Sequence, residues 1–140
     1  MPSNADIVAA ARRMVGTRWR HQGRQPGLGL DCVGLVVCVG KELGLLEFDT
    51  LAYAREAAPE GFVRYFREHG REIPPERLHE GAVLAFREDK YPCHAGIVAR
   101  GTRGPTLIHA YALRRRVVEE ALTREWYGRI VGAFEYLGSG

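Results

Sequence analysis

The chain has 140 residues, 46% hydrophobic and 26% charged, with a formal net charge of +3 and an isoelectric point of about 8.9. This composition is ordinary for one globular domain, and a mild, scattered positive charge without interleaved aromatic residues argues against nucleic-acid binding. Three cysteines without a Cys-x-x-Cys pair argue against a disulfide framework and a structural zinc site, and no apolar run reaches the roughly 20 residues of a membrane span. We therefore expect a single domain over residues 1–140, with no nucleic-acid partner and no membrane span.

The N-terminal segment predicts a helix. Residues 1–6 contain neither the basic nor the apolar region of a signal peptide, so we expect a protein that is cytoplasmic as synthesised. Ser3 and Asp6 have the spacing of a capping box, and Gly16 is suited to end the helix that it begins. One buried face is expected from the apolar residues at helical spacing, which are Ile7, Val8, Ala11, Met14 and Val15.

A loop and a second helix follow. Residues 17–30 are rich in glycine, proline and glutamine, and predict a loop that leads to Cys32. Residues 32–46 carry apolar side chains on every side. Their valines would also suit a strand, but the length of the segment and its charged residues 41–42 favour a buried helix that ends near Gly44. Asp31 then lies at the N-cap position.

The second half of the chain predicts a sheet. Before it, Pro59 is suited to begin a short helix that Gly70 ends, and residues 73–75 predict a connector. Short apolar runs bounded by glycine, proline or charged residues then predict antiparallel strands over residues 82–86, 94–99, 106–110, 117–120 and 130–136. Helices followed by strands indicate an α+β domain with the helices packed on one side of an antiparallel sheet.

Cys32, His94 and His109 are candidates for nucleophilic catalysis. A helix N-terminus favours the thiolate of Cys32, and strand alternation can place the imidazoles of His94 and His109 on one face. His94 would then act as a base oriented by His109, with the Cys32 sulfur within hydrogen-bonding reach of a His94 ring nitrogen. A cysteine in an apolar segment is often a small core residue, and a histidine in a strand is often structural. From these residues alone, a cysteine hydrolase and a purely structural role both stay open.

Several segments, in order along the chain, resemble motifs of the NlpC/P60 cysteine peptidases. Residues 30–36 resemble the Asp-Cys-Ser-Gly-Leu-Val signature around the nucleophile, and residues 94–98 resemble the His-Val-Gly-Ile-Tyr strand around the base. Residues 108–110 resemble the Ile-His-Ala motif of the third polar residue. Residues 16–21 and 80–86 resemble the Gly-Thr-Pro-Tyr-x-Trp and Gly-Asp-Leu-x-Phe-Phe segments. The ordered set covers nearly the whole chain.

This resemblance implies a papain-like α+β fold in which Cys32 begins a central helix packed on an antiparallel sheet. It implies a cysteine peptidase that hydrolyses peptidoglycan stem peptides between D-glutamate and a diamino acid, with Cys32 as nucleophile, His94 as base and His109 as the third residue. No metal or other cofactor is implied. The Asp-Cys-Val-Gly variant and the short chain resemble the phage and prophage branch, which implies phage-tail-like partner proteins and delivery to the cell wall in such a particle.

Candidate substrate-binding residues are Trp19, His21, Asp31 and Val33. Trp19 stands where the family often has a tyrosine whose hydroxyl contacts substrate, and Val33 replaces the usual serine after the nucleophile, so both bear on specificity. His21 lies in the loop before the nucleophile. Two further hypotheses stay open: a weakly active structural or wall-binding component of a phage-tail-like particle, which Trp19 and Val33 motivate, and an acyltransferase on the same fold.

Overall fold

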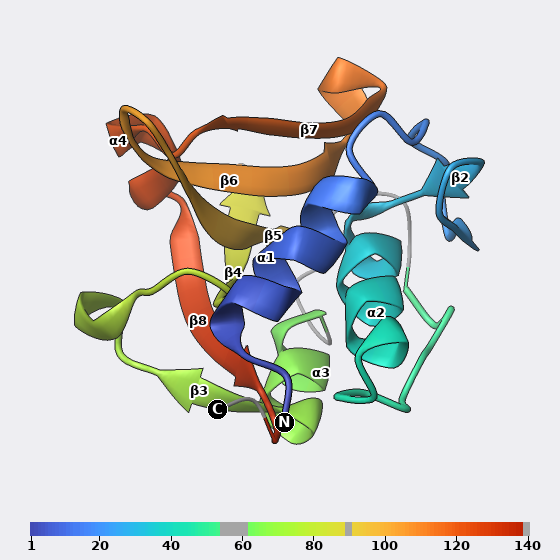
Figure 1. The fold of residues 1–140 in the computed structure, drawn as a ribbon, viewed down its shortest axis with the longest axis horizontal. Helices are drawn as coiled ribbons and strands as arrows, with labels where there is room; N and C mark the ends of the chain where they lie inside the picture. The colour runs from blue at the N-terminus through green and yellow to red at the C-terminus, as the bar shows by residue number, and fades with distance from the viewer. Residues whose placement is uncertain (54–61, 89–90, 139–140) are drawn as a thin grey trace.

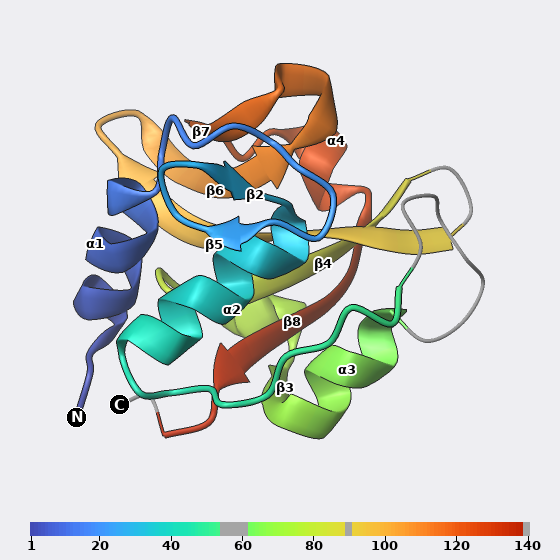
Figure 2. The same cartoon turned by 90° about the vertical axis from the view of Figure 1, so that its right-hand side faces the viewer.

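The computed structural model describes residues 1–53, 62–88 and 91–138 (Figure 1). Within these ranges an antiparallel sheet has the strand order β3 (Gly70–Ile73), β8 (Ile130–Tyr136), β4 (Val83–Glu88), β5 (Tyr91–Gly101), β6 (Gly104–Tyr111) and β7 (Arg116–Ala121). Helices α1 (Asn4–Arg13) and α2 (Cys32–Glu42) cover one face of this sheet (Figures 1 and 2). The arrangement confirms the predicted α+β class, with helices packed on an antiparallel sheet.

Helix α1 begins at the predicted capping box. The Ser3 hydroxyl accepts a hydrogen bond from the backbone N–H of Asp6 at 3.1 Å, and the Asp6 carboxylate accepts one from the backbone N–H of Ser3 at 2.8 Å. These two bonds satisfy N–H groups that have no partner within the helix. Gly16, in the left-handed region at φ +95°, follows the end of the helix as predicted.

Helix α2 confirms the helical interpretation of the apolar segment after Asp31, and it ends two residues before Gly44. Its side chains can be apolar on every side because α2 is enclosed by α1, the sheet and the chain that precedes it. That preceding chain contains two short strands that the sequence did not predict, β1 (Arg24–Gln25) and β2 (Gly29–Leu30). A side chain at Gly34 would overlap the carbonyl oxygen of Gly23, so the first turn of α2 depends on this glycine.

Helix α3 (Phe62–His69) ends at Gly70 as predicted, whereas Pro59 lies outside the described residues. The chain then enters β3 directly, and this strand was not predicted. It pairs with β8 at the edge of the sheet, with Ile73 opposite Ala133. Arg71 and Glu72 are exposed there, so the segment lacks the apolar run that marks a buried strand. A short 3-10 helix, η1 (Pro75–Arg77), follows.

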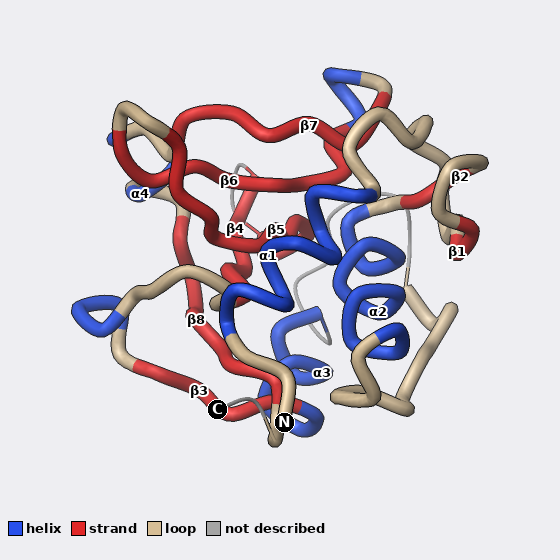
Figure 3. Tube along the Cα trace, viewed as in Figure 1, coloured by secondary structure: helices blue, strands red, loops and turns tan. Residues whose placement is uncertain are grey.

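The five predicted strands are present, as the red segments β4 to β8 of Figure 3 show. Most of them extend one to three residues beyond their predicted ends. Their two faces build two cores. Ala95, Ile97 and Ile108 pack under α1 and α2, whereas Phe86 and Val98 pack on the opposite face with Trp126 of the short helix α4 (Arg124–Tyr127). Among the described residues, no helix is both long and apolar enough to span a bilayer.

Candidate active site

Cys32 is the first residue of α2, and its thiol lies against the backbone of β5. The thiol donates a hydrogen bond to the carbonyl oxygen of Cys93 at 3.9 Å, and the side chain is largely buried. Residues 93–95 of β5 include His94, so the sulfur contacts the stretch of backbone that carries the candidate base. The approach of the start of α2 to β5 is visible in Figure 2.

The surroundings of the Cys32 side chain disfavour its thiolate. Burial raises the pKa of Cys32 above its usual 9.0, and the Asp31 carboxylate adds to this shift. Backbone N–H groups of Ala95 and Val33 favour the thiolate but do not outweigh burial. The predicted stabilisation of a thiolate by the helix N-terminus is therefore present in direction but is smaller than the cost of desolvation.

His94 and His109 lie side by side, as strand alternation predicted. Nε2 of His94 is 2.8 Å from Nδ1 of His109. Extending the β5–β6 register places His109 opposite Gly96, so the two histidines lie diagonally across neighbouring strands. A Cβ at Gly96 would come within 3.0 Å of the His109 Cβ, which shows how closely the backbone of β5 passes the second imidazole.

Aromatic side chains enclose this histidine pair. The rings of Tyr111 and Trp126 lie 5.0 and 5.2 Å from the His109 ring, and Phe86 lies 5.8 Å from the His94 ring. His94 is 4% exposed and His109 is fully buried. Burial, followed by the charges of His109 and Arg129, lowers the pKa of His94 well below its usual 6.5. Burial also lowers the pKa of His109, although the Glu120 carboxylate opposes that shift.

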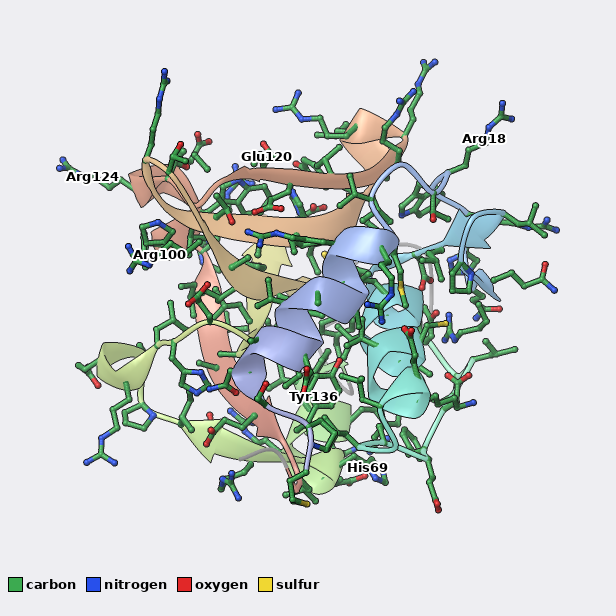
Figure 4. The ribbon with its side chains drawn as sticks, in the orientation of Figure 1. Arg18, His69, Arg100, Glu120, Arg124 and Tyr136 are labelled. Atoms are coloured by element: carbon green, nitrogen blue, oxygen red, sulfur yellow. The ribbon has the colours of Figure 1, made fainter. Side chains whose placement is uncertain are left out.

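Glu120 of β7 is a site residue that the sequence did not single out. Its Oε2 lies 2.8 Å from Nε2 of His109, and its Oε1 accepts a hydrogen bond from Arg114 at 3.3 Å. The sequence could have indicated it, because Glu120 lies in the predicted strand 117–120, which follows the predicted strand of His109. Val118 is opposite His109, and Glu120, which Figure 4 labels beside β7, follows two residues later on the same face.

The Cys32 thiol contacts the backbone beside His94, but no hydrogen bond joins the thiol to the His94 ring in the part of the chain that the structure describes. The Cys32 hydrogen bond within the described part of the chain goes to the Cys93 carbonyl, and the hydrogen bond of the His94 ring goes to His109. The expected hydrogen bond between the Cys32 sulfur and a His94 ring nitrogen is therefore not formed among the described residues, and His94 packs with Phe86 and Trp126 of the core on the sheet face opposite α2.

Asp31 anchors the start of α2. Its carboxylate accepts hydrogen bonds from the backbone N–H groups of Gly34 and Gln22, both at 2.8 Å. It also accepts one from the Tyr53 hydroxyl at 2.6 Å and one from the Arg24 guanidinium at 3.1 Å. This buried carboxylate already receives four donors, and these contacts fix the start of α2 and with it the residue that follows, Cys32.

The other candidate substrate-binding residues lie on different sides of the start of α2. Trp19 is half-buried, packs against the core under α1 and α2, and forms a backbone bridge with Leu30. His21 packs edge-on against the Tyr53 ring at a centroid distance of 5.9 Å. Val33 lines an apolar cavity between α2, α3 and β8. Only His21 thus joins the polar groups around Asp31.

Comparison of the sequence with protein-family models finds no match, and comparison with curated proteins finds none. Solved structures do match. An NlpC/P60 family protein from Bacillus cereus ATCC 10987 has a TM-score of 0.71 at 23% identity, over 97% of this chain and 41% of that chain. The NlpC/p60 domain of the peptidoglycan hydrolase SagA has a TM-score of 0.65 at 21% identity, over 96% of this chain and 99% of that chain. The chain has the NlpC/P60 fold.

The NlpC/P60 fold expected from the ordered motifs is therefore confirmed, and this chain spans less than half of the B. cereus protein. An N-acetylmuramoyl-L-alanine amidase from Bacteroides uniformis ATCC 8492 also matches, with a TM-score of 0.59 at 11% identity, over 94% of this chain and 96% of that chain. Within the described ranges, no three or more histidine, cysteine or acidic side chains are grouped so as to hold a metal ion.

Acidification should destabilise this protein through His94. The unfolded chain takes up a proton near the ordinary histidine pKa of 6.5, whereas burial shifts proton uptake by His94 in the folded chain to lower pH, so stability falls as the pH drops through that range. From about pH 7 to about pH 5, one such histidine lowers the free energy of unfolding by about 2 kcal/mol. Urea unfolding at both pH values measures this loss. The His94→Gln variant should lose less by about that amount, and an unchanged pH dependence would contradict the assignment.

Proposed function

We propose that the protein is a cysteine hydrolase that cleaves peptidoglycan stem peptides at the bond between D-glutamate and a diamino acid. The observation that carries this proposal is the placement of Cys32 at the start of α2, against the β5 backbone on either side of His94. The coupling of His94 to His109 supports it, since an oriented imidazole is what a thiol nucleophile requires. The ordered sequence motifs and the NlpC/P60 fold support the substrate class.

The proposed reaction begins with a neutral thiol. As Cys32 Sγ attacks the carbonyl carbon of the scissile amide, His94 takes the thiol proton, and the carbon–sulfur bond forms. The carbon–nitrogen bond then breaks, and His94 gives the proton to the departing amine. Water, deprotonated by His94, attacks the resulting thioester, and this step releases a free carboxylic acid and restores the thiol. The backbone N–H of Cys32 is suited to contribute to the oxyanion hole.

Defined muropeptides test this proposal. Incubation should yield two products, one ending in a free D-glutamyl carboxyl group and one beginning with the free amine of the diamino acid, both identified by mass. Intact muropeptides after prolonged incubation would contradict hydrolysis. An added amine acceptor distinguishes acyl transfer on the same fold, because a transferase gives the acceptor adduct in place of the free acid.

One observation favours the alternative of a weakly active structural or wall-binding component. The Cys32 thiol is buried and bonded to a backbone carbonyl rather than to His94. This alternative predicts binding to intact cell wall without muropeptide cleavage. The phage-tail-like partners and delivery in such a particle are proposed from the sequence resemblance, and co-purification with tail proteins from an induced lysogen would test them.

A further inference from the structure

Glu120 is the last of three hydrogen-bonded side chains that come from three neighbouring strands. His94 on β5, His109 on β6 and Glu120 on β7 are joined by two contacts of 2.8 Å each. The two imidazoles are buried, whereas the Glu120 side chain is 26% exposed at the edge strand of the sheet. The enclosing aromatic rings exclude water from the histidine pair, which strengthens the electrostatic consequences of each hydrogen bond.

The charge of Glu120 decides which partner donates in each of these two hydrogen bonds. An ionised carboxylate can only accept, so Nε2 of His109 must carry a hydrogen. In neutral His109, Nδ1 then has no hydrogen and accepts the bond from Nε2–H of His94. A neutral His94 with its hydrogen on Nε2 has a lone pair on Nδ1. The carboxylate therefore selects which nitrogen of His94 is free to accept a proton.

The charges of the surrounding groups are consistent with this direction. Burial disfavours the Glu120 carboxylate, but hydrogen bonds from His109 and Arg114 outweigh burial and lower the pKa of Glu120 below its usual 4.5. Two cations lie near the histidine pair. Arg114, from the 3-10 helix η2 (Ala112–Arg114), acts on His109, and Arg129, between α4 and β8, acts on His94. Both lower the pKa of the histidine they act on, so they favour neutral imidazoles beside an ionised Glu120.

We propose that Glu120 is a positioning residue that holds His109 and His94 in the Nε2–H tautomer, so that Nδ1 of His94 is the proton-accepting nitrogen. This role rests on the proposed function, in which His94 takes the proton of Cys32. It differs from an ordinary surface ion pair with Arg114, because it requires a carboxylate or another acceptor at the His109 contact and not merely a folded β7.

Nitrogen-15 NMR of the histidine rings tests the tautomers without a substrate. In the wild-type protein at neutral pH, the ring spectra should show hydrogen on Nε2 and none on Nδ1 for both His94 and His109. The His94→Gln and His109→Gln variants identify the signals. In Glu120→Ala the His109 signals should become a mixture of tautomers. Hydrogen on Nδ1 of His94 in the wild-type protein, or ring spectra unchanged in Glu120→Ala, would overturn the proposal.

Kinetics on muropeptides test the consequence. Glu120→Ala should lower kcat/KM about 10- to 100-fold, mainly through kcat, whereas Glu120→Gln should retain most of it because the amide oxygen can still accept from His109. Glu119→Ala is the matched control, since Glu119 pairs with Arg12 and Thr106 on the other face of β7. If the wild-type protein cleaves muropeptides and Glu120→Ala cleaves them equally fast, the positioning role of Glu120 is refuted while the proposed function stands. A wild type with the expected tautomers but no cleavage would instead refute the proposed function.

Discussion

Replacing Asp31 with alanine should lower the free energy of unfolding by about 3–5 kcal/mol. Its carboxylate is 5% exposed and receives four hydrogen bonds, one of them from the guanidinium of Arg24. Arg24 is itself only 17% exposed, so the variant leaves a largely buried cation without one of its two carboxylate partners. It also removes the N-cap of α2, and with it the anchor of Cys32.

Ser3→Ala is the matched control, because Ser3 is the N-cap of α1 but is exposed and pairs with no buried charge. Its expected cost is about 1 kcal/mol. Urea unfolding of both variants gives the comparison. If Asp31→Ala cost no more than Ser3→Ala, the hydrogen bonds around Asp31 would stabilise the protein no more than an exposed helix cap does, and would not be the support of the proposed nucleophile.

Replacing Cys32 with alanine should reduce muropeptide hydrolysis at least about 1,000-fold, because no other group at the start of α2 can form the thioester. The change removes a single buried sulfur atom, so the fold should survive with a loss of about 1 kcal/mol. The initial rate of product formation, together with the far-ultraviolet circular dichroism spectrum, separates loss of chemistry from loss of structure.

Cys38→Ala serves as the matched control for this variant. Cys38 lies on the same helix, and its thiol donates to the carbonyl oxygen of Arg24 at 3.3 Å, away from β5. Its removal should leave the rate of hydrolysis within about threefold of wild type, since it touches none of the proposed reacting groups. Equal losses in both variants would indicate a general disturbance of α2 in place of a nucleophile at Cys32.

The elements with local signals could be predicted from the sequence. The capping residues Ser3 and Asp31 mark the starts of α1 and α2, and the apolar runs bounded by turns mark five strands. Strand β3 was missed because an exposed edge strand with Arg71 and Glu72 has no apolar pattern, and its pairing with β8 joins residues 60 or more positions apart.

The site could be predicted only as far as its residue types. Strand alternation placed His94 beside His109, but the order of the strands, which brings Glu120 next to His109, is a property of the whole sheet. The effect of burial on the pKa of Cys32 could not be predicted either. A helix N-terminus suggested an activated thiolate at Cys32, whereas packing against β5 raises the pKa of that thiol instead. Desolvation depends on which side chains pack together in the folded core, so a local sequence motif does not reveal it.

The central claim, that Cys32 attacks a stem peptide, is tested most directly by the mass of the enzyme during turnover. Wild-type protein mixed with a defined muropeptide and quenched in acid should contain a fraction heavier by the mass of the acyl fragment. Peptide mapping should place that addition on Cys32, and hydroxylamine should remove it as it removes thioesters. Product formation with no adduct on Cys32, and with the same rate in Cys32→Ala, would contradict the proposed mechanism.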